Sequence, residues 1–440
     1  MRETVRALIP LFASFALLVV GHGLLGTLVG VRMSLAHFSM QAAGAVSACY
    51  SIGFVIGTRM DGRAIRNVLH IRTFAAFCAI AAASVLAFVL FVQPVLWAVL
   101  RLVYGASVAG LYMVMESWLN ANSGPQLRGR ILGLYSMITY IGFGGGQFLL
   151  MAAPPESSRL FLLVAMLLAL SLVPIALARI NPPEVVDIRP LAVGRLYRLQ
   201  PSGLAGSLGA GVIIGSFLGM GPVFAKVSGF SDFEVSLFMG LTISGGFVLQ
   251  WPIGMISDRY DRRHVMTAVS VGIAALSVAI GMLSSDNATP LIALATLWGA
   301  LAFTLYPLSV ALVNDRIGAT EFVPASATLL FLYSLGMIIG NLAAGQLMAV
   351  WGRSGLFWIS VIAATGLAAF TALTARERSP VPAPEPQPYQ ALPRNSPYAS
   401  MMDPRSEAVP GVQLELDLHG DAGSAAATGA EPAPCALRVP

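Results

Sequence analysis

The sequence predicts an all-α membrane protein with twelve transmembrane helices in two pseudo-symmetric halves of six. Three observations support this: 56% of the 440 residues are hydrophobic, only 11% are charged, and the apolar residues come in long uninterrupted runs. An ordinary soluble domain carries about 25% charged residues. About twenty apolar residues form a helix that spans the hydrocarbon core of a bilayer. We therefore expect each run to be a spanning helix.

The apolar runs are bounded by charged residues, glycines and prolines. In the first half we expect helices at about 8–30, 39–60, 72–92, 94–118, 131–151 and 158–180. In the second half we expect them at about 203–226, 233–256, 264–284, 290–314, 323–349 and 354–374. The first run follows Arg2 and Arg6 and is similar to a secretory signal, but the many runs after it favour a retained first helix.

The predicted domains are a first half at 1–180, a cytoplasmic connector at 181–202, a second half at 203–376 and a tail at 377–440. The tail begins with closely spaced prolines and continues with alanine, glycine and aspartate. Such a composition buries too little apolar surface to offset the entropy of ordering. We therefore expect the tail to be disordered in the cytoplasm and largely dispensable.

Positive residues predict the orientation, because arginine and lysine are retained in cytoplasmic segments. If both termini are cytoplasmic, the inner segments hold most of the Lys and Arg residues. The outer segments then hold only Arg32, Arg159, Lys226 and Arg353. This bias predicts a multi-pass protein of the bacterial inner (plasma) membrane, in contact with lipid. It also explains the net charge of +5 without nucleic-acid binding.

The two halves carry matching motifs about 197 or 198 positions apart. The loop after the second predicted helix contains Gly57, Asp61, Arg63 and Arg66, and the loop after the eighth contains Gly254, Asp258, Arg259, Arg262 and Arg263. The fifth and eleventh helices share a further pattern, in which Tyr135, Ser136 and Gly142 recur as Tyr333, Ser334 and Gly340. In parallel repeats of this kind a transport pathway lies at the interface of the halves.

The strings GTRMDGRAIR and GMISDRYDRR resemble the loop signature of the major facilitator superfamily (MFS). Arg101 with Gly105 resembles its RxxxG signature, and the strings ESWLNANS from Glu116 and HIRTFAAF from His70 resemble its YcaD-like branch. The resemblance covers about residues 8–375. It implies a secondary transporter, or permease, whose halves rock to give alternating access.

Charged residues at the predicted inner helix ends form a candidate cytoplasmic gate. We expect Glu116 to face Arg63 and Arg66, and Asp315 to face the arginines of the second loop. Partly desolvated ion pairs of this kind can form and break, and so can close and reopen the cytoplasmic entrance to a transport pathway. The alternative is that these charges only set the topology. The gate candidates are Asp61, Arg63, Arg66, Glu116, Asp258, Arg259, Arg262, Arg263 and Asp315.

Polar residues within membrane spans mark a candidate substrate or ion cavity. These are His22, Arg101, Gln147, Gln250 and Asn341. For the amides, hydrogen bonding between helices is the alternative. The first and seventh helices also contain candidate interruptions, which point to a binding region, although tight helix packing is an equal alternative. These are Gly21, Gly23, Gly26, Gly219, Gly221 and Pro222.

His22 and Arg101 should lie at the same depth, each about 20 Å from the inner membrane edge. No Asp or Glu lies deep in a predicted helix. We therefore hypothesise proton-coupled transport of a small organic anion, in which Arg101 attracts the anion and His22 takes up the proton. The alternative for this pair is that His22 only bonds a neighbouring helix and Arg101 only holds the fourth helix in place. The alternative functions are a multidrug or metabolite exporter of the same fold and a membrane sensor that does not transport.

No Walker loop, nucleophile elbow or metal-ligand spacing favours an enzyme. The three cysteines, Cys49, Cys78 and Cys435, are not spaced as a pair or as metal ligands. We therefore expect no enzyme activity, no cofactor, no metal and no obligate protein partner. The expected partners are a small-molecule substrate, protons and lipid.

Overall fold

Every secondary-structure element in the described part of the computed structural model is helical, which confirms the all-α prediction. The structure describes residues 2–68, 70–124, 126–178, 189–283, 287–377, 389–390 and 392–406, with the side chains of 2–7, 60–68 and 376–377 excepted. All of them belong to one unit, Met1–Glu407.

The first half contains six long helices. They are α1 (Arg2–Leu35), α2 (Met40–Val68), α3 (His70–Leu90), α4 (Pro94–Ala121), α5 (Arg128–Gly146) with its 3₁₀ continuation η1 (Gln147–Ala152), and α6 (Arg159–Leu177). A short helix, α7 (Val193–Leu199), lies in the predicted connector, where the sequence predicted only a polar linker.

The second half repeats this order. Its helices are α8 (Pro201–Val227), α9 (Asp232–Arg259), α10 (Arg262–Met282), α11 (Ala288–Ala302) followed by α12 (Leu305–Asn314), α13 (Phe322–Trp351) and α14 (Gly355–Glu377). The 3₁₀ turns η2 (Ala319–Glu321) and η3 (Gly352–Ser354) flank α13, and η4 (Pro397–Met402) lies in the tail.

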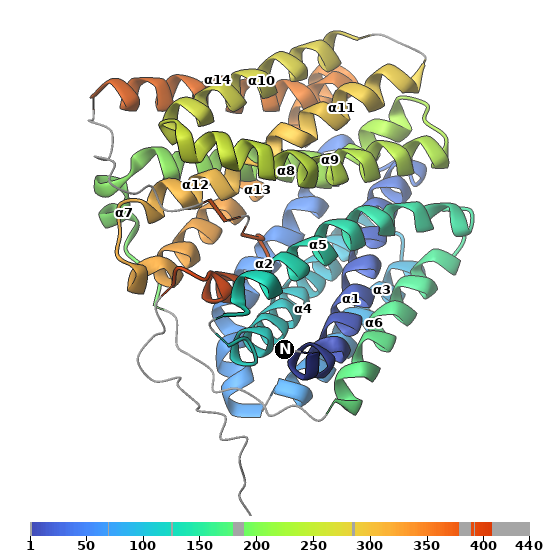
Figure 1. The fold of residues 1–440 in the computed structure, drawn as a ribbon. Helices are drawn as coiled ribbons and strands as arrows, with labels where there is room; N and C mark the ends of the chain where they lie inside the picture. Colours follow the sequence, from blue (N-terminus) through green and yellow to red (C-terminus); the bar gives the residue numbers. More distant parts are fainter. Residues whose placement is uncertain are drawn as a thin grey trace, which may run out of the picture. The chain divides into compact units, whose positions relative to one another are not determined.

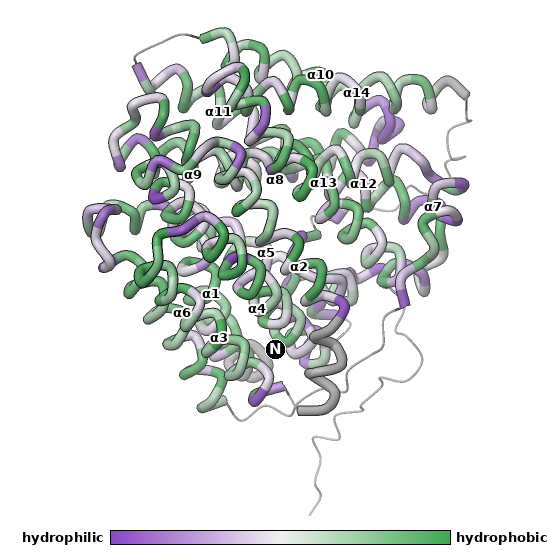
Figure 2. Tube along the Cα trace, turned by 180° about the vertical axis from the view of Figure 1, so that it is seen from behind, coloured by the Kyte–Doolittle hydropathy of each residue, from purple (hydrophilic) through white to green (hydrophobic). Residues whose placement is uncertain are grey.

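Ten stretches of the described chain are long and apolar enough to cross a membrane. One of them, Ala319–Ala375, contains both α13 and α14, and α5 with η1 lies outside the ten. Counting α13 and α14 separately and adding α5 gives the twelve predicted spans. Figure 2 shows hydrophobic residues along these helices and hydrophilic residues mostly toward their ends.

Local sequence determines where several helices begin. Pro94 and Pro201 stand in the first turns of α4 and α8, where a missing N–H leaves no hydrogen bond unmade. At α9, Ser231 and Glu234 form a reciprocal capping box, which satisfies N–H groups at the start of the helix. The side chain of Asp261 accepts a hydrogen bond from the Arg263 N–H and begins α10.

The two halves pack in the same way internally. In the first, α1 packs on α5 and α6, α2 on α4, and α3 on α6; in the second, α8 packs on α13 and α14, α9 on α11, and α10 on α14. Between the halves, α1 packs on α8, α2 on α13 and α5 on α9 (Figure 1). This repetition agrees with the internal repeat in the sequence.

We call the ends of the helices near α7 the connector side and the opposite ends the distal side. Glycines bring the halves together at the distal side. A Cβ on Gly30 would lie 2.8 Å from the Pro222 Cβ, and one on Gly44 would lie 2.6 Å from the Asn341 carbonyl oxygen. α5 approaches α9 closely at Gly144 in the same way. The distal side is therefore closed by direct helix contact.

α1 and α8 run unbroken through the glycines that the sequence suggested as helix interruptions. Two of these glycines allow close packing. A Cβ on Gly23 would lie 2.5 Å from the Phe143 carbonyl oxygen, and one on Gly21 would lie 3.2 Å from the Leu167 Cβ. Small residues let membrane helices approach closely in this way.

The structure also differs from the prediction of a disordered tail. Residues 389–390 and 392–406, which we call the tail segment, are folded, and η4 packs against α4, α5 and α13. In Figure 1 it is the red segment beside α5 and α13. Leu392, Tyr398, Ala399 and Met402 are buried there. Residues 378–388, 391 and 407–440 lie outside the described residues.

Candidate functional site

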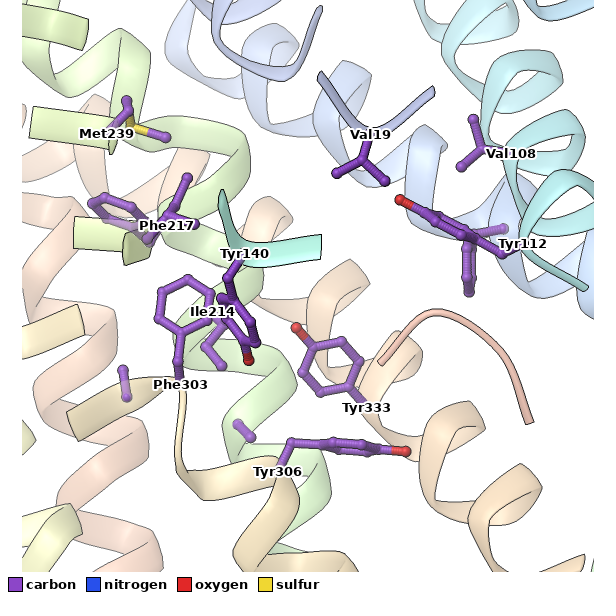
Figure 3. Close-up of a cluster of buried hydrophobic side chains, with 14 of the residues drawn as sticks. Val19, Val108, Tyr112, Tyr140, Ile214, Phe217, Met239, Phe303, Tyr306 and Tyr333 are labelled. Carbon is purple, nitrogen blue, oxygen red and sulfur yellow. The ribbon is translucent and has the colours of Figure 1, made fainter. Parts of the chain in front are cut away.

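A cavity of about 130 Å³ lies between the two halves. Its lining comes from α1, α2, α4 and α5 of the first half, α8, α9 and α13 of the second, and the tail segment. Both halves therefore contribute to one site. Figure 3 shows its aromatic surroundings, with Tyr140 of α5 beside Phe303 and Tyr333 of the second half.

Arg101 of α4 lines this cavity and is only 6% exposed. Its guanidinium carbon lies 4.9 Å from the centre of the Tyr50 ring, a cation–π contact. Its Nε is buried without a hydrogen-bond partner among the described residues. The described lining contains no Asp or Glu. Arg101 is thus a buried positive charge with no carboxylate from the cavity wall beside it.

His22 of α1 lines the same cavity and is held by two tyrosines. Its Nδ1 lies 3.1 Å from the Tyr104 hydroxyl, and its Nε2 lies 3.2 Å from the Tyr50 hydroxyl. A neutral imidazole donates through one nitrogen and accepts through the other, so one tyrosine accepts and the other donates. Arg101 is close enough to interact with His22 electrostatically. The predicted pair therefore meets in one site.

The spacing of Arg101 and Gly105 explains how Tyr50 reaches the guanidinium. Residues four apart lie on the same helix face, and this face of α4 meets α2. The hydrogen atom of Gly105 leaves room for the Tyr50 backbone, because a Cβ there would overlap the Tyr50 carbonyl oxygen. Gly53 of α2 contacts the backbone of α4 equally closely. The close helix crossing therefore positions the Tyr50 ring on Arg101.

Replacing Gly105 by alanine should destabilise the protein, because the new methyl group has no space between α2 and α4. Overpacking of this kind costs about 1–3 kcal/mol, so the melting temperature should fall clearly. Gly133→Ala on α5 is the matched control, since no atom lies within 4 Å of its added Cβ. Thermal unfolding of both variants in detergent checks this. Equal melting temperatures would contradict the close crossing.

The three amide side chains that were predicted to line the cavity lie in different positions. Asn341 lines the cavity, and its Oδ1 is buried without a hydrogen-bond partner in the described structure. Gln147 does not line it: its side chain bonds Thr27 and the Gly23 carbonyl of α1. Gln250 lies outside the lining too and bonds the Tyr140 hydroxyl across the halves. Gln147 and Gln250 therefore link helices in this structure, which is the alternative role that the sequence left open for them.

The glycines and the proline predicted as helix interruptions also differ in their position relative to the cavity. Gly26 and Gly219 line the cavity, whereas Gly21, Gly23, Gly221 and Pro222 lie outside its lining. No atom lies within 4 Å of a Cβ built on Gly26, so this glycine leaves open space in the cavity. Gly219 instead leaves space for the Asn341 side chain.

On the connector side, three of the second-half gate residues, Asp258, Arg262 and Asp315, form a cluster. Arg262, 3% exposed, has its Nη2 2.9 Å from Asp258 Oδ1 and its Nε 3.1 Å from Asp315 Oδ2. Arg263 pairs with Asp261 at 2.7 Å. Burial opposes ionisation of Asp261, but hydrogen bonds from Arg263 outweigh it and lower the Asp261 pKa. Arg259 is exposed.

The first-half gate residues behave differently. Glu116 is fully buried, and its carboxylate accepts hydrogen bonds from the hydroxyl groups of Tyr135 and of Ser396 in the tail segment. The side chains of Asp61, Arg63 and Arg66 lie outside the described residues, so the predicted pairing with Glu116 stays a prediction. The structure adds a tail contact that the sequence did not indicate.

Two features of the site escaped the sequence analysis. Five tyrosines, Tyr50, Tyr104, Tyr112, Tyr140 and Tyr333, surround or line it, and hydropathy reading counts tyrosine as apolar. The second feature is Arg394 with Asn395, which reach the cavity from the tail segment. Among the described residues, no group of three or more His, Cys, Asp or Glu has a metal-binding arrangement.

Comparison with known proteins agrees with this fold. The model of the Major Facilitator Superfamily matches residues 11–321 and 229–414. The chain is 27% identical over 354 residues to the uncharacterized MFS-type transporter YcaD of Escherichia fergusonii, covering 80% of this chain and 91% of that protein. The uncharacterized MFS-type transporter YE1530 of Yersinia enterocolitica matches with the same identity and coverage. The resemblance to the YcaD-like branch is thus confirmed.

Solved structures show the same fold at low identity. A mutant of the nucleoside transporter NupG superposes with a TM-score of 0.71 at 15% identity, over 84% of this chain and 99% of that chain. A bacterial homologue of the human lysosomal transporter Spinster, in an inward-facing and unoccupied conformation, gives 0.68 at 14% identity, over 85% and 97%. With a family model that matches most of its length, the chain belongs to the Major Facilitator Superfamily of membrane transporters.

Proposed function

We propose that this transporter moves a small organic anion by alternating access, with proton uptake at His22. One observation carries the proposal: Arg101 is buried in the cavity between the halves, with no carboxylate in the described lining. An unpaired buried charge is costly. An anionic substrate would neutralise it and gain charge-assisted hydrogen bonds.

The size of the cavity supports a small substrate. Its volume of about 130 Å³ is below the roughly 300–1,000 Å³ of pockets for drug-sized ligands. Arginine also favours planar anions such as carboxylates, because its guanidinium donates two parallel hydrogen bonds. Both points favour an organic acid over the large mixed substrates of a multidrug exporter.

The contacts of His22 support coupling to protons. A doubly protonated imidazole donates through both nitrogens, so the Tyr50 and Tyr104 hydroxyls would both become acceptors. A second positive charge close to Arg101 is unfavourable until an anion offsets it. Binding of the anion and uptake of a proton at His22 therefore favour each other. Tyr50 touches both groups and connects them.

The closed distal side supports alternating access. In the proposed cycle, the contacts at Gly30 and Gly44 separate while the connector side closes, and the anion then leaves on the other side. The positive-residue bias supports a cytoplasmic connector side, in the bacterial inner membrane. On this proposal the Asp258–Arg262–Asp315 cluster belongs to the cytoplasmic gate.

Uptake into proteoliposomes tests the proposal with a panel of small organic acids and matched neutral amides. We expect transport of at least one acid and of none of the amides. His22→Gln should retain part of this transport but lose its dependence on pH, because His22 is the proposed proton acceptor. An unchanged pH profile would exclude His22 as the coupling group. Binding without any transport would favour a sensor.

A further inference from the structure

The tail segment is anchored on the connector side by polar contacts to both halves. In the first half, the Ser396 hydroxyl bonds Glu116, and Asn395 Nδ2 lies 2.9 Å from the Tyr135 hydroxyl. In the second half, the backbone N–H of Tyr389 bonds Asp258, at 2.9 Å from Oδ1. The tail segment therefore joins the two halves on the side where they must separate and close.

These anchors bring Arg394 into the central cavity. Its guanidinium carbon lies 4.6 Å from the centre of the Phe303 ring and 5.6 Å from that of Tyr333. Arg394 lines the cavity together with Arg101. Its Nη1 is buried and has no hydrogen-bond partner in the part of the chain that the structure describes. The Nε of Arg101 is likewise buried without a hydrogen-bond partner among the described residues.

The docked tail segment thus adds a second guanidinium to a cavity whose described lining has no carboxylate. Two carboxylates of the helical halves contact the tail segment, and both already have partners. Glu116 accepts hydrogen bonds from Tyr135 and Ser396. Asp258 accepts one from the Tyr389 N–H and pairs with Arg262. Two enclosed positive charges repel each other, and both are costly without an anion. An anion that carries two negative charges offsets both at once.

From this arrangement we infer that the tail segment is a mobile part of the substrate site, which docks cooperatively with a small dianion bound between Arg101 and Arg394. The inference rests on the proposed transport of anions and narrows its substrate class. Coupling between two binding events is reciprocal. A dianion must therefore hold the tail segment in place, and the docked tail segment must raise the affinity for the dianion by the same factor.

Release of the tail segment can be measured by labelling a buried cysteine. The test uses the full-length protein, with serine in place of Cys49, Cys78 and Cys435. Ala399→Cys then supplies the single cysteine, because Ala399 is only 1% exposed when the tail segment is docked. Maleimide labelling in detergent then reports undocking. The probes are succinate, its monoamide succinamate as the singly charged match, and inorganic sulfate as a compact dianion of different chemistry.

Succinate or sulfate should slow the labelling about 5- to 150-fold, the usual range of coupling between two sites, and succinamate should slow it much less. The effect should vanish in Arg394→Gln and in Arg101→Gln and return in part in Arg394→Lys. Arg405→Gln is the matched control, because Arg405 pairs with Asp403 within the tail segment. In this variant the ratio of labelling rates with and without succinate should equal that of the parent protein. Ser396→Ala, which weakens docking, should lower succinate affinity.

Each other result has a distinct meaning. If succinate or sulfate speeds the labelling, the tail segment competes with the anion and the inference is wrong. If either anion raises the melting temperature through Arg101 while the labelling rate stays the same, anion binding stands and the role of the tail segment does not. If neither anion changes the melting temperature or the labelling rate, the inference of a dianion site is overturned, and the panel of organic acids in proteoliposomes decides the proposed transport of anions.

Discussion

Replacing Arg101 by glutamine should reduce anion transport about 100-fold or more without destabilising the substrate-free protein. The variant loses a charge-assisted contact to the anion, worth about 1.5–3 kcal/mol, and the long-range attraction of the cavity. It also removes a buried charge that lacks a carboxylate in the described lining, so the apparent stability should stay equal or rise. Uptake into proteoliposomes and thermal unfolding measure the two effects.

Arg262→Gln is the matched control, because Arg262 is equally buried but paired with Asp258 and Asp315. Its loss removes the guanidinium that pairs with both carboxylates, so this variant should melt at a lower temperature. Arg101→Lys should keep the charge but bind the anion more weakly than arginine does, because the planar fork is lost. If Arg101→Gln melts as low as Arg262→Gln, Arg101 mainly holds α4 in place.

Much of the fold could be predicted because membrane helices are specified by length and composition. The predicted spans agree with the structure to within a few residues for most helices, and the repeat between Asp61 and Asp258 indicated two similar halves. Helix packing was harder to predict. The glycines of α1 and α8 suggested interruptions, but in the structure their surroundings differ: Gly23 lies against the Phe143 backbone, Gly26 faces open space and Gly219 lies against the Asn341 side chain. Only the three-dimensional neighbour distinguishes these roles.

The site could be predicted only where a polar side chain contradicts its apolar surroundings. Arg101 and His22 stand out in that way, and both line the cavity. Gln147 and Gln250 stand out equally, yet their hydrogen bonds are made to other helices. The tail segment was missed for a different reason: its few apolar residues are buried by the helical halves, and composition does not show such a partner.

Gly44→Leu should shift the transporter away from the distally closed state and reduce transport strongly, by about tenfold or more. The Cβ of residue 44 would lie 2.6 Å from the Asn341 carbonyl oxygen and 3.0 Å from the Gly345 Cα, so a leucine side chain cannot fit while α2 and α13 touch. A penalty of about 1–3 kcal/mol for overpacking corresponds to about a 5- to 150-fold change in the equilibrium between the two states. The distal ends should then separate.

A cysteine at Ser334, which lines the cavity, measures this shift by labelling with a membrane-impermeant reagent from the distal side. Labelling should be faster in Gly44→Leu than in the parent protein. Gly145→Leu is the matched control, since Gly145 lies near the distal end of α5 and has no atom within 4 Å of an added Cβ. If the cysteine of Ser334→Cys is labelled at the parent rate in both leucine variants, the contact at Gly44 does not close the distal side. The halves must then alternate about a different surface.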